Sequence, residues 1–181
     1  MMIDAQRSAL MLIDVQEKLL PGIHEKERFV DNCRWLLEVA QLLEVPTLAS
    51  EQYPQGVGPT TETLRSLLPE DKFFGKTHFS CVQAPEVYPQ MEALEREQWI
   101  LCGMEAHVCV LQTALDLKAK GRQVFVVADA ISARSAQDTE LAIARLREEG
   151  IRIVSREMVA FEWLKRADAP QFKAFSKGYL Q

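Results

Sequence analysis

Residues 99–117 of this chain read WILCGMEAHVCVLQTALDL, and this stretch decides the fold. Its apolar start predicts a buried strand, Gly103 predicts a sharp turn, and the following pattern predicts a helix that starts near Cys109. A thiol in the first turn of a helix faces unpaired backbone N–H groups and the positive end of the helix dipole. We therefore expect the pKa of Cys109 to be lowered and its thiolate to act as a nucleophile.

Two other apolar segments also end on reactive side chains. Residues 8–13 precede Asp14, and a short strand near 71–75 precedes Lys76. In an open α/β sheet, ligands bind outside the carboxyl ends of the strands. We expect Asp14 there as the proton acceptor for Cys109 and then as the general acid, and Lys76 as the cation that holds the thiolate and carboxylate charges in place.

The bulk properties are those of a globular protein with one domain over residues 1–181. Hydrophobic residues make up 48% and charged residues 26%, and no apolar run approaches the roughly 20 residues of a membrane span. A net charge of −5 without a basic stripe argues against nucleic acid as a partner. The amino terminus lacks a signal-peptide pattern, so we expect a cytoplasmic protein, and the four cysteines lack disulfide or zinc spacing, so we expect four free thiols.

Apolar runs of strand length alternate with segments of helical period, which predicts repeated βαβ units around a parallel sheet. Residues 53–59 are the best loop candidate, and residues 166–181 are assigned no regular structure. The expected strands lie near 8–13, 45–50, 71–75, 98–102, 122–128 and 151–155. The expected helices lie near 26–44, 60–67, 86–96, 107–120, 137–149 and 157–165.

Three pieces of sequence resemble the isochorismatase-like cysteine hydrolases, a superfamily that includes nicotinamidases and N-carbamoyl amide hydrolases. They are LIDVQ at residues 12–16, KTHFS at residues 76–80, and Gly103 to Asp116 with its cysteine in place. Their order and spacing carry the resemblance over roughly residues 9–134. It implies a three-layer α/β/α sandwich with a six-stranded parallel sheet in the order 3-2-1-4-5-6, with helices on both faces.

The resemblance also implies a reaction, the hydrolysis of a small amide or carbamoyl-type C–N bond in a small-molecule substrate. Cys109 would attack the carbonyl, backbone N–H groups of Cys109 and of Glu105 or Ala106 would hold the oxyanion, and water would release the acyl enzyme. A cis peptide bond between Met104 and Glu105 is a further expectation. True isochorismatases cleave a vinyl ether and need no thiol at this position, so Cys109 favours an amidase.

Around this centre, Gln16, Tyr53 and Phe79 are the expected substrate-binding residues, and His78 could lie at the edge of the pocket. Nicotinamidases carry an Asp-x-His metal cluster after the second strand. Here residues 50–54 read SEQYP, in which Glu51 alone could bind a metal. We therefore expect neither a metal site nor a cofactor.

Two other readings remain. One is a non-catalytic homo-oligomeric binding or scaffold protein of the same fold, which the complete Asp14, Lys76 and Cys109 set disfavours. The other is a redox-sensing thiol, which the lack of an evident resolving cysteine disfavours. In every case we expect a homo-oligomer, because an aromatic tail with Phe172, Phe175 and Tyr179 would be costly to expose on a monomer and could dock on a neighbouring subunit.

Overall fold

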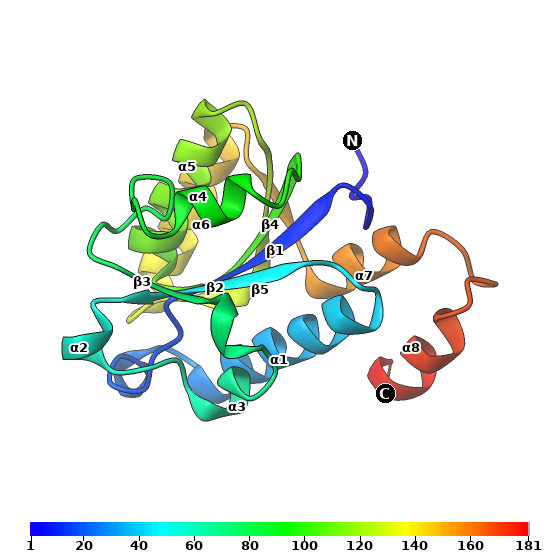
Figure 1. The fold of residues 1–181 in the computed structure, drawn as a ribbon, viewed down its shortest axis with the longest axis horizontal. Coiled ribbons are helices and arrows are strands. Elements are labelled where there is room, and N and C mark those ends of the chain that lie inside the picture. Colours follow the sequence, from blue (N-terminus) through cyan, green and yellow to red (C-terminus); the bar gives the residue numbers. More distant parts are fainter. Residues whose placement is uncertain (181) are drawn as a thin grey trace.

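The computed structural model describes residues 1–180. Its centre is a six-stranded parallel sheet in the order β3-β2-β1-β4-β5-β6 (Figure 1). The resemblance implies this order, so the expected fold is confirmed. The strands are β1 (Ser8–Ile13), β2 (Thr47–Gln52), β3 (Phe73–Lys76), β4 (Gln98–Met104), β5 (Gln123–Ser132) and β6 (Arg152–Val154).

Helices cover both faces of the sheet, which gives three layers (Figure 1). One face packs against α4, α5 and α6, and the other against α1, α7 and α8. The helices are α1 (Lys26–Leu42), α2 (Pro54–Val57), α3 (Glu62–Arg65), α4 (Tyr88–Glu92), α5 (Leu111–Ala119), α6 (Ala136–Glu148), α7 (Arg156–Leu164) and α8 (Phe172–Tyr179). Shorter turns are η1 (Leu20–Gly22), η2 (Glu70–Lys72) and the π-helical η3 (Ala106–Val110).

Strand β1 lies in the middle of the sheet, and all six of its residues are buried. Leu10 and Leu12 pack in the core beneath α1 and α7, whereas Met11 and Ile13 pack in the core beneath α5 and α6. This is why the strand is a continuous apolar run rather than an alternating one. Within residues 1–180, no helix is both long enough and apolar enough to cross a membrane.

The register of the sheet brings the carboxyl ends of four strands to one edge. Ile13, the last residue of β1, pairs with Ser50 of β2 on one side and with Gly103 of β4 on the other. Lys76 ends β3 and pairs with Gln52. The carboxyl ends of these parallel strands therefore share one edge of the sheet, where such folds place their ligands.

Local structure departs from the sequence prediction in two places near this edge. The segment 53–59, expected as a loop, contains the single turn α2 after Pro54, which pre-sets the backbone for a first helical turn. The expected helix over 107–120 begins instead as the π-helical turn η3, and the regular α-helix starts only at Leu111. Cys109 therefore lies in a π-helical turn ahead of α5.

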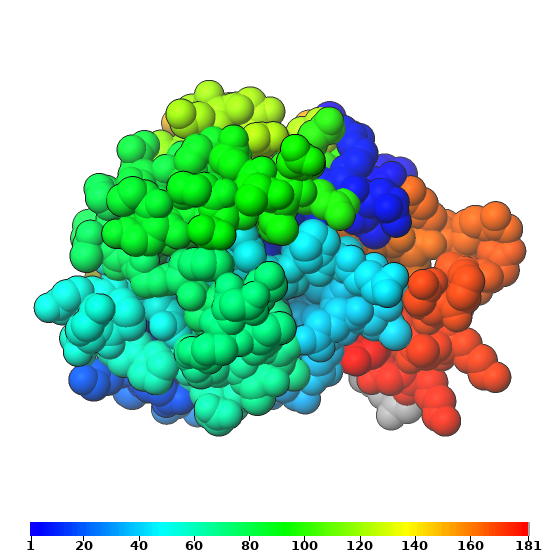
Figure 2. All heavy atoms as spheres, in the orientation of Figure 1, coloured from blue at the N-terminus to red at the C-terminus, as the bar shows by residue number. Residues whose placement is uncertain are grey.

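The C-terminal segment also differs from its prediction. Residues 172–179 form α8, and Phe175 is fully buried against Trp35 of α1, with ring centroids 5.9 Å apart. Tyr179 packs edge-on against the same indole. The aromatic tail thus docks on its own chain, and the expectation that Phe175 needs a neighbouring subunit to cover it is wrong. Figure 2 shows the C-terminal segment, orange to red, projecting from one end of the molecule.

Candidate active site

Asp14 follows β1 directly, and its backbone lies in the left-handed region at a φ of 54°. Asp tolerates this conformation better than most residues. Its side chain is buried and receives two hydrogen bonds. Ser50 Oγ donates to Oδ1 at 2.7 Å, and Lys76 Nζ donates to Oδ2 at 2.8 Å. The carboxylate is therefore held in one orientation at the end of the central strand.

Lys76 is a buried cation with every proton engaged. Its side chain has no solvent exposure, and its ammonium donates to Asp14, to Gln52 Oε1 at 2.5 Å, and to the carbonyl oxygens of His78 and Phe79 at 3.1 and 3.0 Å. Burial is the largest single effect and lowers the pKa of Lys76, but the charges of Asp14, Cys81 and Cys109 and the hydrogen bond to Asp14 together outweigh it, so the pKa is raised overall. Lys76 is consequently a permanent positive charge beside Asp14.

Cys109 lies beside this pair, 6% exposed, with Sγ 3.9 Å from Gln52 Oε1. Its pKa is raised, first by burial and then by the charge of Asp14, and the opposing charge of Lys76 does not compensate. The expectation of a lowered pKa is therefore wrong. The sequence indicates that Cys109 lies near a helix start, which favours a lowered pKa. It does not show that the sulfur is buried or that a carboxylate lies beside it, and both raise the pKa. At rest the group is a thiol, and Gln52 Oε1 lies within reach as the acceptor of its proton.

Gly103 permits the close approach of β4 to β1 behind this group. Its φ is 125°, and a Cβ there would lie 2.2 Å from the carbonyl oxygen of Ile13. No side chain fits that space. The next turn contains a cis peptide bond between Met104 and Glu105, so this expectation is confirmed.

A cavity of about 210 Å³ opens onto Cys109. Asp14 and Gln52 line it beside the thiol, and Phe79 and Glu105 belong to its walls. Its remaining walls are apolar and come from the loop after β1, from α2, from the end of β4 and from η3: Leu19, Val57, Met104 and Val108. Of the three expected substrate-binding residues, only Phe79 lines this cavity.

Gln16 and Tyr53 have other positions. Gln16 is fully buried and binds backbone: its Nε2 donates to the carbonyl oxygens of Gln52 and Gly58 at 2.9 and 2.8 Å, and its Oε1 accepts from Gln52 N at 2.7 Å. It therefore positions the loops that form the cavity. The Tyr53 side chain is 53% exposed and its ring lies beside Gly56, outside the cavity.

Sequence reasoning missed two residues of the site, Ser50 and Gln52. Both lie on β2, and both bind the charged pair directly. Ser50 and Gln52 are two residues apart, so their side chains lie on the same face of the sheet. They also lie at the carboxyl end of the strand next to β1, where such folds bind ligands, and this position could have identified them as site residues.

Glu105 forms a charged group at the wall of the cavity. Arg134 Nε donates to its Oε2 at 2.9 Å, and His107 Nε2 lies 3.7 Å from the same oxygen. Arg134 is 66% exposed, whereas His107 Nδ1 is buried without a hydrogen-bond partner. The Glu105 carboxylate therefore lies at the cavity wall with the Arg134 cation and the His107 ring beside it.

Glu51 has a structural role in place of a metal-binding one. Its Oε1 accepts from Thr60 N and Oγ1 at 2.7 and 2.8 Å and from Arg65 at 2.6 Å. Among residues 1–180, no three His, Cys, Asp or Glu side chains gather as a metal site would require.

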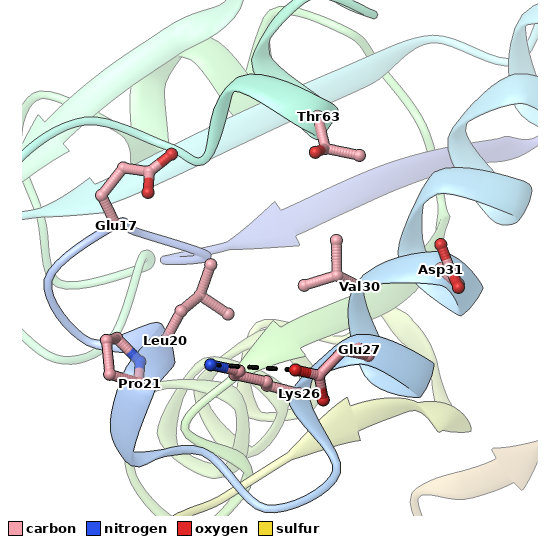
Figure 3. A pocket seen from close by; sticks show the side chains of 8 residues that line it. All are labelled: Glu17, Leu20, Pro21, Lys26, Glu27, Val30, Asp31 and Thr63. Atoms are coloured by element: carbon pink, nitrogen blue, oxygen red, sulfur yellow. Dashed lines mark ion pairs between the residues drawn. The ribbon is translucent and has the colours of Figure 1, made fainter.

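A larger cavity of about 410 Å³ lies elsewhere, between η1, the start of α1 and α3 (Figure 3). Carboxylates of Glu17, Glu27 and Asp31 surround it, together with Lys26. It holds no thiol, so the chemistry of Cys109 belongs to the smaller cavity.

The sequence matches the isochorismatase domain family over residues 8–158. The chain belongs to this family. The isochorismatase domain-containing protein 2A of Mus musculus is 39% identical over 175 residues, which cover 95% of this chain and 82% of that protein. The matched region contains Asp14, Lys76 and Cys109, so the whole site of this isochorismatase-domain protein lies inside the family's domain.

Solved structures share the fold. A MAR1 ribonuclease from Caenorhabditis elegans is 37% identical, with a TM-score of 0.92 and coverage of 100% of this chain and 93% of that one. The YcaC gene product of Escherichia coli, described as an octameric hydrolase of unknown specificity, is 24% identical, with a TM-score of 0.91 and coverage of 99% and 91%. At that identity the second likeness shows the fold alone.

Proposed function

We propose that this isochorismatase-domain protein is a cysteine-dependent hydrolase of a small amide or carbamoyl-type C–N bond. The observation that carries the proposal is the buried ion pair of Lys76 and Asp14 beside the Cys109 thiol at the mouth of a cavity. Burying an ion pair rarely stabilises a protein relative to apolar residues, so such a pair beside a nucleophile favours a chemical role.

Asp14 acts first as the base. As Sγ of Cys109 attacks the carbonyl carbon, its proton passes to the Asp14 carboxylate, and a C–S bond forms. Protonated Asp14 then gives this proton to the nitrogen, the C–N bond breaks, and the amine leaves a thioester on Cys109. Water attacks the thioester, passes a proton through Asp14 to the sulfur, and releases the carboxylic acid. Lys76 holds the Asp14 carboxylate in its orientation before the first step.

The turn that follows β4 supplies the oxyanion site in this proposal. Backbone N–H groups of Cys109 and of Glu105 or Ala106 stabilise the negative oxygen of the tetrahedral intermediate. Gln52 joins the site as a positioning residue, because its amide contacts both Lys76 and Cys109.

The name of the nematode relative raises RNA as another substrate. The charged groups at this cavity are carboxylates, and the chain has a net charge of −5. Binding of a phosphate backbone relies on Lys and Arg. This arrangement favours a small uncharged substrate over a nucleic acid, and we propose a small-molecule hydrolase that forms a homo-oligomer.

The test is release of ammonia from a panel of small amides and carbamoyl compounds, together with mass spectrometry of the trapped acyl enzyme. We expect a mass increase on Cys109 that matches the acyl group, and loss of turnover in Cys109→Ala. Cys33→Ala, which changes a buried thiol of α1, serves as the matched control and retains turnover. Absence of both an adduct and turnover would favour the non-catalytic scaffold reading.

A further inference from the structure

The cavity beside Cys109 is small. Its volume of about 210 Å³ lies below the roughly 300–1,000 Å³ of pockets that hold drug-sized ligands. A liquid water molecule occupies about 30 Å³, so the space holds roughly seven non-hydrogen atoms. Five of its lining side chains are apolar: Leu19, Val57, Phe79, Met104 and Val108. The group that fills this space is therefore short and apolar.

The charges at the cavity are of one sign. Asp14 and Glu105 line it, and both are carboxylates. Among residues 1–180, no Lys, Arg or His side chain lines it. Lys76 is near, but its three N–H groups already serve four acceptors and its side chain is fully enclosed. It has no donor left for a substrate.

The cation bound to Glu105, Arg134, does not add a positive charge to the cavity lining. Arg134 binds the Glu105 carboxylate from a position 66% exposed to solvent, outside the cavity lining. A carboxylate carried into the cavity by a substrate would lose its water and meet the carboxylates of Asp14 and Glu105, while their partners Lys76 and Arg134 do not line the cavity. Burial of a charge in this way is strongly unfavourable.

We propose, on the basis of the amidase function above, that the substrate carries a short, apolar and uncharged acyl group and that amides bearing a carboxylate are excluded. A short aliphatic amide of about six non-hydrogen atoms fits the volume and the walls. The scissile carbonyl then lies at Cys109, and the alkyl part contacts the apolar side chains opposite. The selectivity comes from a lining whose only charged side chains are Asp14 and Glu105 and which, among the described residues, offers no cation to an anionic substrate.

A matched pair of substrates tests the selectivity. Butyramide and succinamate have the same acyl chain length and differ in a terminal methyl or carboxylate. We expect kcat/KM, measured as ammonia release, to be at least about 100-fold higher for butyramide. Equal rates for the two amides, or a preference for succinamate, would overturn the inference while leaving the amidase proposal intact.

A second test does not depend on turnover. Iodoacetamide and iodoacetate alkylate thiols and differ in charge at the same size. The alkylation rates at Cys109 are measured by mass spectrometry of its peptide. We expect the iodoacetamide-to-iodoacetate rate ratio at Cys109 to be at least about tenfold higher than the same ratio for the free thiol of N-acetylcysteine methyl ester. If no amide is hydrolysed but this ratio is high, the amidase proposal fails and the cavity's selectivity stands. A ratio equal to that of the small thiol overturns the selectivity.

A charge-inserting variant gives the control. Val57→Lys places an ammonium at the wall, and Val57→Met changes the same wall without charge. We expect the lysine variant to lower the iodoacetamide-to-iodoacetate ratio at Cys109 at least about fivefold and the methionine variant to preserve it. A preference for anions in the unchanged protein that disappears in Arg134→Gln would show that Arg134 binds substrate carboxylates, and would overturn the inference.

Discussion

The carboxylate of Asp14 has two opposing effects on Cys109. It is the proposed acceptor of the thiol proton, yet its charge raises the pKa of that thiol after burial has done so. Asp14→Asn keeps the size of the side chain and removes the charge. We expect kcat/KM for an amide to fall about 100-fold or more, because the proton acceptor is lost. We expect alkylation of Cys109 by iodoacetamide at pH 8 to become faster, because the thiol pKa falls.

Asp116→Asn is the matched control. Asp116 lies on α5, seven residues beyond Cys109, and accepts a hydrogen bond from Gln83 at 3.1 Å. Its neutralisation should leave both turnover and alkylation unchanged. Slower alkylation of Cys109 in Asp14→Asn would contradict the electrostatic account of the thiol.

Gly103 gives a second prediction for a single residue. Gly103→Ala would place a methyl group 2.2 Å from the Ile13 carbonyl oxygen at a φ that L-residues rarely adopt. We expect a loss of at least about 3 kcal/mol in the free energy of unfolding, measured with urea. Gly22→Ala, at a position with nothing within 4 Å, should change this free energy by less than about 1 kcal/mol. Equal values for both variants would refute the steric argument.

The sequence shows which reactive side chains follow a strand, but not their solvation. Asp14, Lys76 and Cys109 could be predicted as site residues because each follows an apolar strand. The register of the sheet then brings the ends of those strands together. The pKa of Cys109 could not be foreseen, because it depends on burial. The sequence predicts Gln16 as a substrate contact, and the structure shows its side chain bonded to backbone. An alternation pattern does not distinguish these two roles.

At the scale of elements, α8 depends on its contact with α1. Phe175 is fully buried and packs edge-on against Trp35. Phe175→Ala should cost about 3–5 kcal/mol at this contact and release the helix. Limited proteolysis should then cut within residues 166–171 in the variant before the rest of the chain. Lys173→Ala changes an exposed residue of the same helix and should not alter the cleavage pattern.

Element boundaries could be predicted where the sequence carries a clear local signal, either a glycine that ends a helix or the start of a buried apolar run. Gly121 and Gly150, with φ of 79° and 77°, end α5 and α6 as expected, and the buried runs of β1 and β4 start where predicted. Strand β5 extends to Ser132, beyond its expected end at 128, since its length follows from pairing with β4 rather than from its own residues. No local pattern marks η3. Helix α8 does carry the apolar spacing of an amphipathic helix in Phe172, Phe175 and Tyr179, but the face that covers it is the distant Trp35 of α1.

At the scale of the whole molecule, buried thiols make stability depend on pH. Burial raises the pKa of Cys33, Cys81 and Cys109 above the ordinary 9.0. Above pH 9 the unfolded chain therefore loses thiol protons that the folded protein keeps. Each such thiol lowers the free energy of unfolding by about 1.4 kcal/mol per pH unit there. Urea unfolding between pH 7 and 10 should show a plateau followed by a steep decline.

Cys33→Ala should make that decline shallower, because one of the shifted thiols is gone. An unchanged slope in this variant would assign the alkaline instability to other groups. Lys76 contributes in the same direction at still higher pH, since its raised pKa means that its stabilising charge is lost only above 10.5.

The assembly state is a separate prediction. Because Phe175 is buried within its own chain, it does not support a homo-oligomer. Helix α7, however, exposes two large apolar residues, Met158 and Phe161, whose exposed fractions are 48% and 44%. Apolar side chains of this size on neighbouring positions of a helix favour contact with another copy. We expect light scattering at micromolar concentration to give a multiple of 20.6 kDa. A mass near that of one chain would reject the homo-oligomer.

The enclosure of Lys76 has a consequence for ionic strength. Dissolved ions screen charges that water can reach, within about 8 Å at physiological salt, and they reach neither the ammonium nor its carboxylate partner. The electric field at the Cys109 sulfur is therefore set by the fold rather than by the medium. Acylation of Cys109 by an uncharged amide should proceed at the same rate in dilute buffer and in concentrated salt.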